Sequence, residues 1–386
     1  MADTSTITIQ QAFQTPYVQG VISRISTPDT AFQRFYGAME NRTFTPSRVF
    51  GWDIFDMTRT IATAKAPMTE ATVIRKKQIG TQYGALLRIH EKKMIFDEEI
   101  ANLRPPGSPI GTLDQRGEQW AVRQIKDMSL RHRNMLEWAM SKTLQGGFGL
   151  KVAGEFMYFT ELGTSGNAFD IDMNIPSSHK TNAGGIIGNW DDPSADVIDQ
   201  IMQLEAQAIK ETGYPITCCW ISRKTLGYLM KNVSLSLIAG SANRVWSSWP
   251  AESAKVEPAN RSLGAYGPVV FSAFPHLKFF TNDVVMNLGS SSDPQGTDTS
   301  DGTNTSRLLP ENMALFTPDP DGSWMTIYEG HEPVRETVVS QSEFARGFKT
   351  WVRPFVGSPP GREFYMLDNF LPVLPIPRAV WPTTVW

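Results

Sequence analysis

The pattern of apolar positions predicts one long helix in the first half of the chain. From Asp114 to about Gln145, apolar or semi-apolar side chains recur every three or four residues, which is the spacing of one helix face. The members of this stripe are Ile125, Met128, His132, Met135, Leu136, Ala139 and Thr143. Gly146 and Gly147 follow and end the helix. About 30 residues give a helix of roughly 45 Å, whereas a compact globule of this chain length is only about 55 Å across. The pattern therefore predicts an elongated subunit.

The stretch before this helix predicts an arm and a long hairpin. Residues 1–50 are interrupted by prolines and show no pattern of a compact core, and Ala31–Tyr36 is a candidate for a short helical or extended anchor. The runs 72–79 and 85–96 are strand-like, and Gly80 and Gly84 lie between them. We expect a two-stranded excursion with its turn near these glycines.

The stretch after the long helix alternates strand-like and helical patterns. Asp192 and Pro193 predict the cap and first turn of a helix that ends before Gly213. Helices are also expected at 222–232 and 235–245, and strands at 156–160, 168–173, 216–221, 269–272 and 277–281. The polar segment 289–306 is expected to be a surface loop.

The C-terminal part predicts a hairpin followed by two long strands. The runs 313–316 and 325–328 flank the turn-forming segment 318–322, which favours a hairpin. Strand character then follows at 349–356 and 364–374.

Composition favours a protein that buries surface against neighbours. With 386 residues, the chain exceeds one ordinary core, so two or three lobes are expected. Only 19% of the residues are charged, yet the chain has 11 Trp and 21 Phe, and aromatic residues are enriched in interface cores. A large monomer with an aromatic core fits the composition equally well. The net charge of −3 shows no basic excess, so any nucleic acid is expected to be enclosed rather than gripped.

Sequence motifs give little support for catalysis, metal or cofactor binding. The phosphate-binding GxxxxGK pattern, the GxSxG elbow and the HExxH motif are all missing. The adjacent cysteines Cys218 and Cys219 suit neither a disulfide nor a zinc site. Asp293, Asp298 and Asp301 offer oxygen ligands for calcium, but their spacing does not match an EF-hand. We therefore expect no enzyme activity, no cofactor and no metal.

The sequence shows no sign of export or of a membrane span. The N-terminus has no basic region followed by an apolar one, and no run of about 18 apolar residues occurs. We expect a protein that is made in the cytosol.

Short motifs near the C-terminus resemble those of a known family. They are Trp351-Val352, Pro359-Pro360-Gly361, Arg362-Glu363-Phe364 and Leu371-Pro372-Val373-Leu374, with a second stretch at Leu309-Pro310-Glu311-Asn312. Together with the order of elements, they resemble the lambda-type major capsid protein E family of tailed phages. The resemblance covers nearly the whole chain and implies the α+β Hong Kong-97-type capsid fold. The polar loop 289–306 has no counterpart in the family.

The resemblance also implies a division of the chain. It places an N-terminal arm at 1–50, an extended β-hairpin loop at 51–112 and the spine helix of the peripheral domain at 113–147. Peripheral-domain strands would follow at 148–190, an axial domain at 191–340 and C-terminal return strands at 341–386.

In such a shell, the hairpin loop of one subunit would cross the spine helix of the next. The resemblance implies ion pairs between basic residues of the loop and acidic residues of the neighbouring helix. The basic residues are Arg75, Lys76, Lys77, Arg88, Lys92 and Lys93, and the acidic ones are Glu118, Asp127 and Glu137. Most of the adhesion would come from Trp120, Trp138, Trp351 and Phe364.

The implied function is a major coat protein that assembles as hexamers and pentamers around double-stranded DNA. The expected partners are further copies of the chain, a separate scaffolding protein and a portal, with a decoration protein as a further candidate. No membrane is expected. An encapsulin-like nanocompartment shell is the main alternative. A hydrolase with an unrecognised site and a tail or baseplate component are weaker ones.

Overall fold

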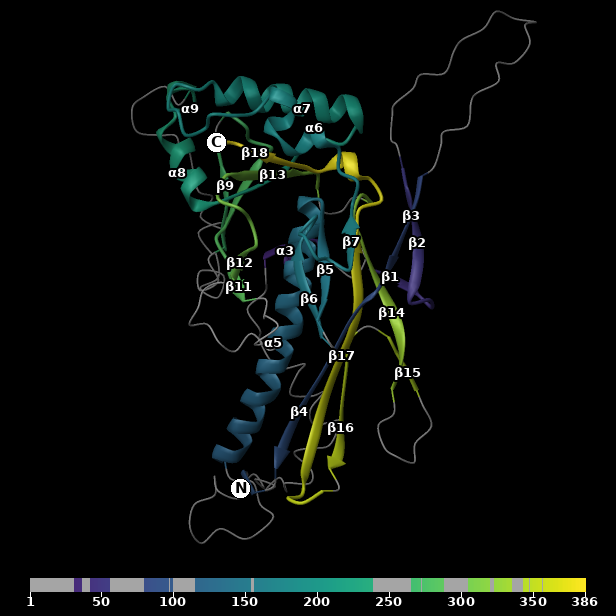
Figure 1. The fold of residues 1–386 in the computed structure, drawn as a ribbon. Coiled ribbons are helices and arrows are strands. Elements are labelled where there is room, and N and C mark those ends of the chain that lie inside the picture. Colours follow the sequence, from purple (N-terminus) through teal and green to yellow (C-terminus); the bar gives the residue numbers. More distant parts are fainter. Residues whose placement is uncertain are drawn as a thin grey trace, which may run out of the picture.

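The computed structural model is elongated, with a long stem and a compact lobe at one end. It describes residues 31–36, 42–55, 80–96, 98–99, 115–153, 156–238, 265–271, 273–287, 305–319, 323–334, 343–346, 348–355 and 357–386. Helix α5 and the long strands β4, β16 and β17 run along the stem, and helices α7, α8 and α9 lie in the lobe (Figure 1). The mixture of helices and sheets confirms the expected α+β class.

Helix α5, Gln115–Gln145, confirms the strongest sequence prediction. Ile125, Met128 and His132 are buried, as the apolar stripe predicts. From Leu136 to Leu144 every side chain is buried, so this end of the helix is surrounded by protein on all sides. Strand β5, Gly147–Ala153, begins immediately after the helix. Gly147 has a φ of 127°, and a Cβ there would lie 2.0 Å from the Ile171 carbonyl oxygen, so only glycine fits.

The stem contains a six-stranded sheet. Four of its strands follow the order β1 (Arg42–Thr45), β14 (Thr326–Val334), β17 (Gly361–Val373) and β16 (Lys349–Phe355). The other two are β4 (Leu87–Phe96), which pairs with β17, and β15 (Glu343–Arg346), which pairs with β14. The strands predicted at 349–356 and 364–374 are thus confirmed. Strand β17 is central, because β16 pairs with its residues 361–367, β4 with residues 361–370 and β14 with residues 370–373.

The lobe is built on a five-stranded sheet. Its order is β18 (Trp381–Thr384), β13 (Met313–Thr317), β8 (Cys218–Ile221), β10 (Lys278–Asn282) and β9 (Ala265–Val270). Side chains alternate between its two faces. Cys219 and Ile221 pack on one face with helices α7 (Val197–Glu211), α8 (Arg223–Lys231) and α9 (Val233–Ile238). Cys218 and Trp220 face the core that is shared with the stem. The helices expected at 195–212 and 222–232 are confirmed.

Smaller elements complete the described part of the chain. Strands β6 (Phe156–Glu161) and β7 (Phe169–Asp172) flank β5. Strands β2 (Val49–Ile54) and β3 (Gly80–Ala85) form a two-stranded ribbon, as do β11 (Val285–Asn287) and β12 (Thr305–Arg307). The short helices are α3 (Ala31–Tyr36), α6 (Ser177–Lys180), η2 (Asn182–Gly185) and η3 (Pro377–Ala379).

Two predicted strand pairings are wrong. The runs 313–316 and 325–328 do not form a hairpin, because β13 belongs to the lobe sheet and β14 to the stem sheet. The chain also does not turn at Gly80 and Gly84: these glycines lie within β3, which pairs with β2, and β4 instead pairs with β17. Helix α7 is capped by Asp196, not by Asp192. Residues 72–79, 239–245 and most of 289–306 lie outside the described part of the chain.

Helix α3 shows that the region expected to be an arm contributes to the core. Phe32 and Tyr36 are fully buried, and the Tyr36 hydroxyl accepts a hydrogen bond from Trp220 Nε1 at 2.8 Å. The carboxylate of the buried Glu137 on α5 accepts hydrogen bonds from the backbone N–H groups of Phe32 and Gln33, at 2.8 and 2.9 Å. Glu137 therefore fixes the start of α3 against the spine helix.

We expect Glu137→Gln to reduce the free energy of unfolding by about 1–3 kcal/mol. The glutamine side chain keeps one acceptor oxygen, but its NH₂ group faces the second backbone N–H of α3. That buried N–H group then has no hydrogen-bond acceptor. Chemical denaturation would measure the loss. Glu205→Gln, on the partly exposed side of α7, is a control that should change stability little; equal effects would contradict the assigned role of Glu137.

Candidate functional site

Three of the predicted inter-subunit ion-pair residues, Lys92, Lys93 and Asp127, form ion pairs inside the chain. Lys92 Nζ lies 3.0 Å from Glu363 Oε1, and Lys93 Nζ lies 3.5 Å from Asp127 Oδ2. Arg88 is an exposed residue of β4. Arg75, Lys76 and Lys77 lie outside the described residues. A role of these side chains between subunits stays a prediction.

The pairs between strand β4 and helix α5 form a small charge ladder. Lys93 on the strand faces Asp127 on the helix, and Glu91 faces Arg131 with an Oε1–NH2 distance of 3.0 Å. The two strand residues are two positions apart and the two helix residues are four apart, which are matching lengths of about 6–7 Å. The positive charge lies on the strand in one ion pair and on the helix in the other. If the helix shifted along the strand by the distance between the two pairs, residues of like charge would therefore face each other. The ladder therefore fixes the register of the spine helix.

Most of the predicted aromatic contact residues are buried in their own chain. Trp138 is 1% exposed and packs edge-on against Phe148, Trp351 stacks on Tyr365, and Phe364 is 2% exposed. Trp120 is half-buried, and only the backbone of Glu118 is described. A buried side chain offers little surface to a neighbour, so we expect internal packing to be the main role of Trp138, Trp351 and Phe364.

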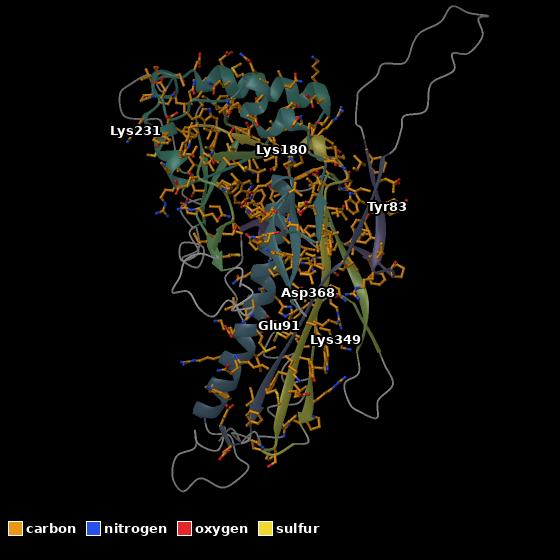
Figure 2. The ribbon with its side chains drawn as sticks, in the orientation of Figure 1. Tyr83, Glu91, Lys180, Lys231, Lys349 and Asp368 are labelled. Carbon is orange, nitrogen blue, oxygen red and sulfur yellow. The ribbon has the colours of Figure 1, made fainter. Side chains whose placement is uncertain are left out.

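Exposed apolar side chains that the sequence did not single out lie elsewhere. Tyr83 on β3 is 75% exposed and its ring lies over Gly51, where a Cβ would come within 3.1 Å of the ring. Figure 2 shows Tyr83 on the outer edge of the molecule, away from the lobe. In the lobe, Met202 and Ile209 on α7 and Met230 on α8 are 58%, 46% and 45% exposed. Such side chains are candidates for contact with other molecules.

A partly buried carboxyl group lies in the stem sheet. Asp368 on β17, labelled in Figure 2, is close to Glu329 on β14. Glu329 pairs with Arg42 on β1 at 2.5 Å. Burial, reinforced by the negative charge of Glu329, raises the pKa of Asp368 to about 7. The Asp368 carboxyl group therefore titrates near neutral pH. No sequence pattern marks it, because the signal arises only when three strands come together.

A second titratable pair lies between the spine helix and β4. Both ring nitrogens of the buried His132 lack a hydrogen-bond partner among the described residues, and Nε2 is 3.8 Å from Glu91 Oε2. Burial lowers the pKa of His132 to about 4 and raises the pKa of Glu91. Burial thus favours the neutral form of each group.

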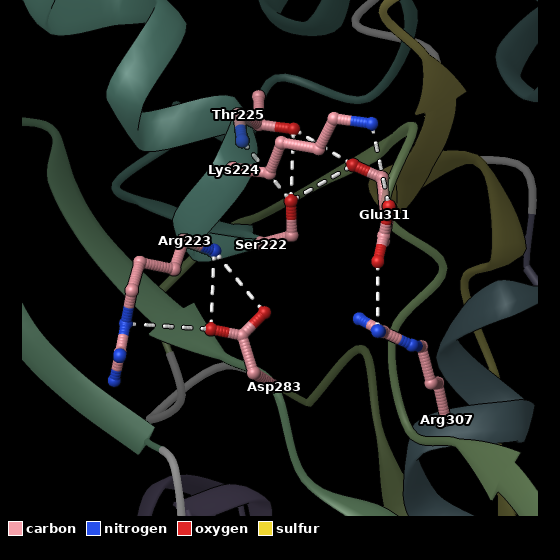
Figure 3. Close-up of polar contacts among 7 residues, drawn as sticks. All are labelled: Ser222, Arg223, Lys224, Thr225, Asp283, Arg307 and Glu311. Atoms are coloured by element: carbon pink, nitrogen blue, oxygen red, sulfur yellow. Dashed lines mark hydrogen bonds and ion pairs between the residues drawn. The ribbon is translucent and has the colours of Figure 1, made fainter.

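Helix α8 begins in a polar network (Figure 3). The Ser222 hydroxyl accepts a hydrogen bond from the Thr225 N–H at 3.1 Å and donates one to the Glu311 carbonyl oxygen at 2.9 Å. Asp283 accepts a hydrogen bond from the Arg223 N–H. The Glu311 carboxylate pairs with Lys224 at 3.5 Å and Arg307 at 2.7 Å. The network joins α8 to the segments that follow β10 and β12.

Because Ser222 caps α8 and also bonds to the Glu311 backbone, Ser222→Ala should lower stability by about 1–2 kcal/mol. Glu311→Ala should cost less than about 1 kcal/mol, since its two ion pairs are partly exposed. Thermal unfolding of the two variants would compare them. A larger loss for Glu311→Ala would contradict the view that the cap, and not the ion pairs, stabilises this end of α8.

The described residues show neither a metal cluster nor a membrane helix. Among them, no three His, Cys, Asp or Glu side chains are placed to hold a metal ion, and no helix is long and apolar enough to cross a membrane. Burial raises the pKa of the thiols of Cys218 and Cys219, which makes both poor nucleophiles. Asp293, Asp298 and Asp301 lie outside the described part.

Several solved structures resemble this fold. The putative capsid protein of a prophage from E. coli CFT073 has a TM-score of 0.59 at 14% identity, and the match covers 97% of this chain and 99% of that one. The mature capsid of bacteriophage PhiM1 gives a TM-score of 0.46 at 10% identity, covering 92% and 87%. The SrpI encapsulin of Synechococcus elongatus PCC 7942 gives 0.40 at 9% identity, covering 89% and 84%. The first of these confirms the expected capsid fold.

Sequence comparison gives the family directly. None of the curated proteins matches this chain. The family described as "Phage major capsid protein E" matches residues 20–248, which is more than half of the chain and includes the whole of helices α5, α7, α8 and α9. The resemblance seen in the C-terminal motifs and the fold of the stem and lobe agree with it. The chain belongs to the phage major capsid protein E family.

Proposed function

We propose that this chain is the coat subunit of a tailed-phage head, assembling as hexamers and pentamers into an icosahedral shell around double-stranded DNA. The observation that carries the proposal is the family match over residues 20–248. It favours a phage head over the nanocompartment shell, because the matching family is one of phage capsid proteins.

The physical character of the subunit supports this role. An elongated molecule with a stem and a lobe can contact several neighbours at once, and exposed apolar groups such as Tyr83 and Met202 are available for those contacts. Individual ion pairs of this kind contribute only about 0–1 kcal/mol each. The net charge of −3 suits a protein shell that encloses DNA without binding it tightly.

The regions of the subunit belong to the same proposal. The arm (1–50), extended loop (51–112), spine helix (113–147), peripheral strands (148–190), axial domain (191–340) and return strands (341–386) follow the family pattern. Helix α5 supports the spine assignment. The last range contributes to both sheets, since β16 and β17 lie in the stem and β18 in the lobe.

The partners proposed are further copies of the chain, a separate scaffolding protein, a portal and a decoration protein, with assembly in the host cytoplasm. The role assigned is structural. Self-association is supported by the family; the other partners are those that the resemblance to phage capsid proteins implies.

Electron microscopy of the chain, expressed together with the genes beside it, tests the proposal. Closed shells of uniform diameter with six-fold and five-fold clusters are expected. Shells filled with a protein cargo instead of DNA after infection would support the nanocompartment reading. Single subunits or small oligomers in the presence of a scaffolding candidate would overturn the proposal.

A further inference from the structure

Helix α7 carries a buried apolar face and a second, exposed apolar stripe that no other described element of the chain covers. Val197, Ile201, Leu204 and Ala208 are buried against the lobe sheet. On the other side, a second stripe at spacings of four and three residues consists of the exposed Met202, Ala206 and Ile209. Met202 is 58% exposed and Ile209 46%. Spacings of three and four residues are those of a helix that packs on another helix.

The exposed stripe has the shape of a socket. Met202, Glu205, Ala206 and Ile209 occupy positions i, i+3, i+4 and i+7, which surround a hole that receives one side chain from a facing helix. The small side chain of Ala206 leaves room in this hole for the side chain of the facing helix. Glu205 is held at its edge by His276, with an oxygen–nitrogen distance of 2.6 Å.

The surface around the start of α7 is acidic. Asp191, Asp192, Asp196 and Asp199 are all exposed. A partner surface that packs on this side of α7 would bind favourably only if its centre were apolar and basic residues lay beside that centre.

Helix α8 presents a surface of that kind. Arg223, Gly227 and Met230 lie along one exposed stripe, and a Cβ at Gly227 would have no neighbour within 4 Å, so the stripe is open to a close approach. Met230 is 45% exposed. Lys231 makes no ion pair within the described part of the chain, and Figure 2 shows it on the outer flank of the lobe.

We infer that Met230 of one subunit inserts into the α7 socket of a second copy, with Lys231 facing the acidic surface beside it. Both surfaces lie on the outside of the same lobe, so they can meet only between two copies. A contact between two different surfaces repeats from copy to copy and closes into a ring when the rotation permits. The inference rests on the proposed coat function and assigns the lobe-to-lobe contact within a capsomer.

A disulfide would trap this contact. In the double variant Ala206→Cys with Met230→Cys, each subunit carries both halves, so mild oxidation should link neighbours in sequence. The native thiols Cys218 and Cys219 are buried and do not compete. On a non-reducing gel, the expected result is a shift from one band to a ladder that ends at the ring size, reversed by a reducing agent.

Control variants distinguish failure of this inference from failure of the proposed coat function. Ala206→Cys with Val285→Cys uses a partner position that is 50% exposed on a different element and should give no ladder. A strong dimer band from either single variant would indicate a symmetric contact and overturn the inference. Shells that form from the double variant without a ladder would overturn it too, while the coat function stands. If the unsubstituted chain forms no particles, the coat function itself fails.

Discussion

Trp220→Ala is expected to lower the free energy of unfolding by about 3–5 kcal/mol. Trp220 lies on the face of the lobe sheet that is shared with the stem, and it is only 2% exposed. Its ring stacks on Phe280 at a centroid distance of 4.6 Å and contacts Phe32 at 4.7 Å, while its Nε1 donates to the Tyr36 hydroxyl. Removing the ring would leave a cavity where α3, the lobe and the stem meet.

Urea denaturation, read by circular dichroism, would measure the loss. Trp386→Ala is the matched control, because Trp386 is 37% exposed, with Lys224 at 4.1 Å from its ring centroid. We expect the control to cost no more than about 1 kcal/mol. If the two variants lost the same stability, the Trp220 cluster would not be the junction that holds α3 to the sheet.

The second large effect is expected from Asp368→Asn, and it depends on pH. The pKa of this carboxyl is raised to about 7 in the folded chain, against about 3.9 in an unfolded one. Between these values the folded state holds a proton that the unfolded state has released. The stability of the protein therefore falls as the pH rises through this window. Near pH 8, Asp368 is ionised beside Glu329, whereas asparagine stays neutral.

We thus expect Asp368→Asn to raise the free energy of unfolding by about 2–4 kcal/mol near pH 8 and by almost nothing near pH 4. The full shift corresponds to about 4 kcal/mol, and the partial exposure of the side chain reduces it. Thermal unfolding across pH would show the difference. Asp191→Asn, at an exposed position, is the control and should change the free energy of unfolding little. A gain that is equal at both pH values would rule out titration as its cause.

The sequence predicted the elements whose signal is local. Helix α5 was found from a stripe with six buried members among its seven, and β17 from its apolar run. What the stripe could not show is the burial of the opposite face from Leu136 to Leu144. That burial depends on Ser141 and Thr143, whose hydroxyls donate to the carbonyl oxygens of Leu308 and Pro372 and so make polar residues acceptable inside.

Pairings between distant segments were harder to predict. The turn residues after β13 correctly mark the end of a strand, but turn chemistry does not decide which sheet the next strand joins. Ion pairs show the same limit: Lys93 and Asp127 were both predicted to form ion pairs between subunits, and the sequence did not show that they also pair with each other inside one subunit. The α7 socket was missed because Met202 and Ile209 resemble ordinary core positions until the true core face is known.

The position of β18 has a consequence for the timing of synthesis. Strand β13 ends the lobe sheet until residues 381–384 pair with it, and β13 carries the apolar Leu315 and Phe316. About 70 residues must be added between the two strands, which takes about 3–14 s at the usual rate of translation. During that interval the nascent chain presents an unpaired, apolar strand edge, which is a template for wrong association. A chaperone that binds extended apolar segments should therefore engage this chain while it is still on the ribosome, and release it once its last strand has emerged.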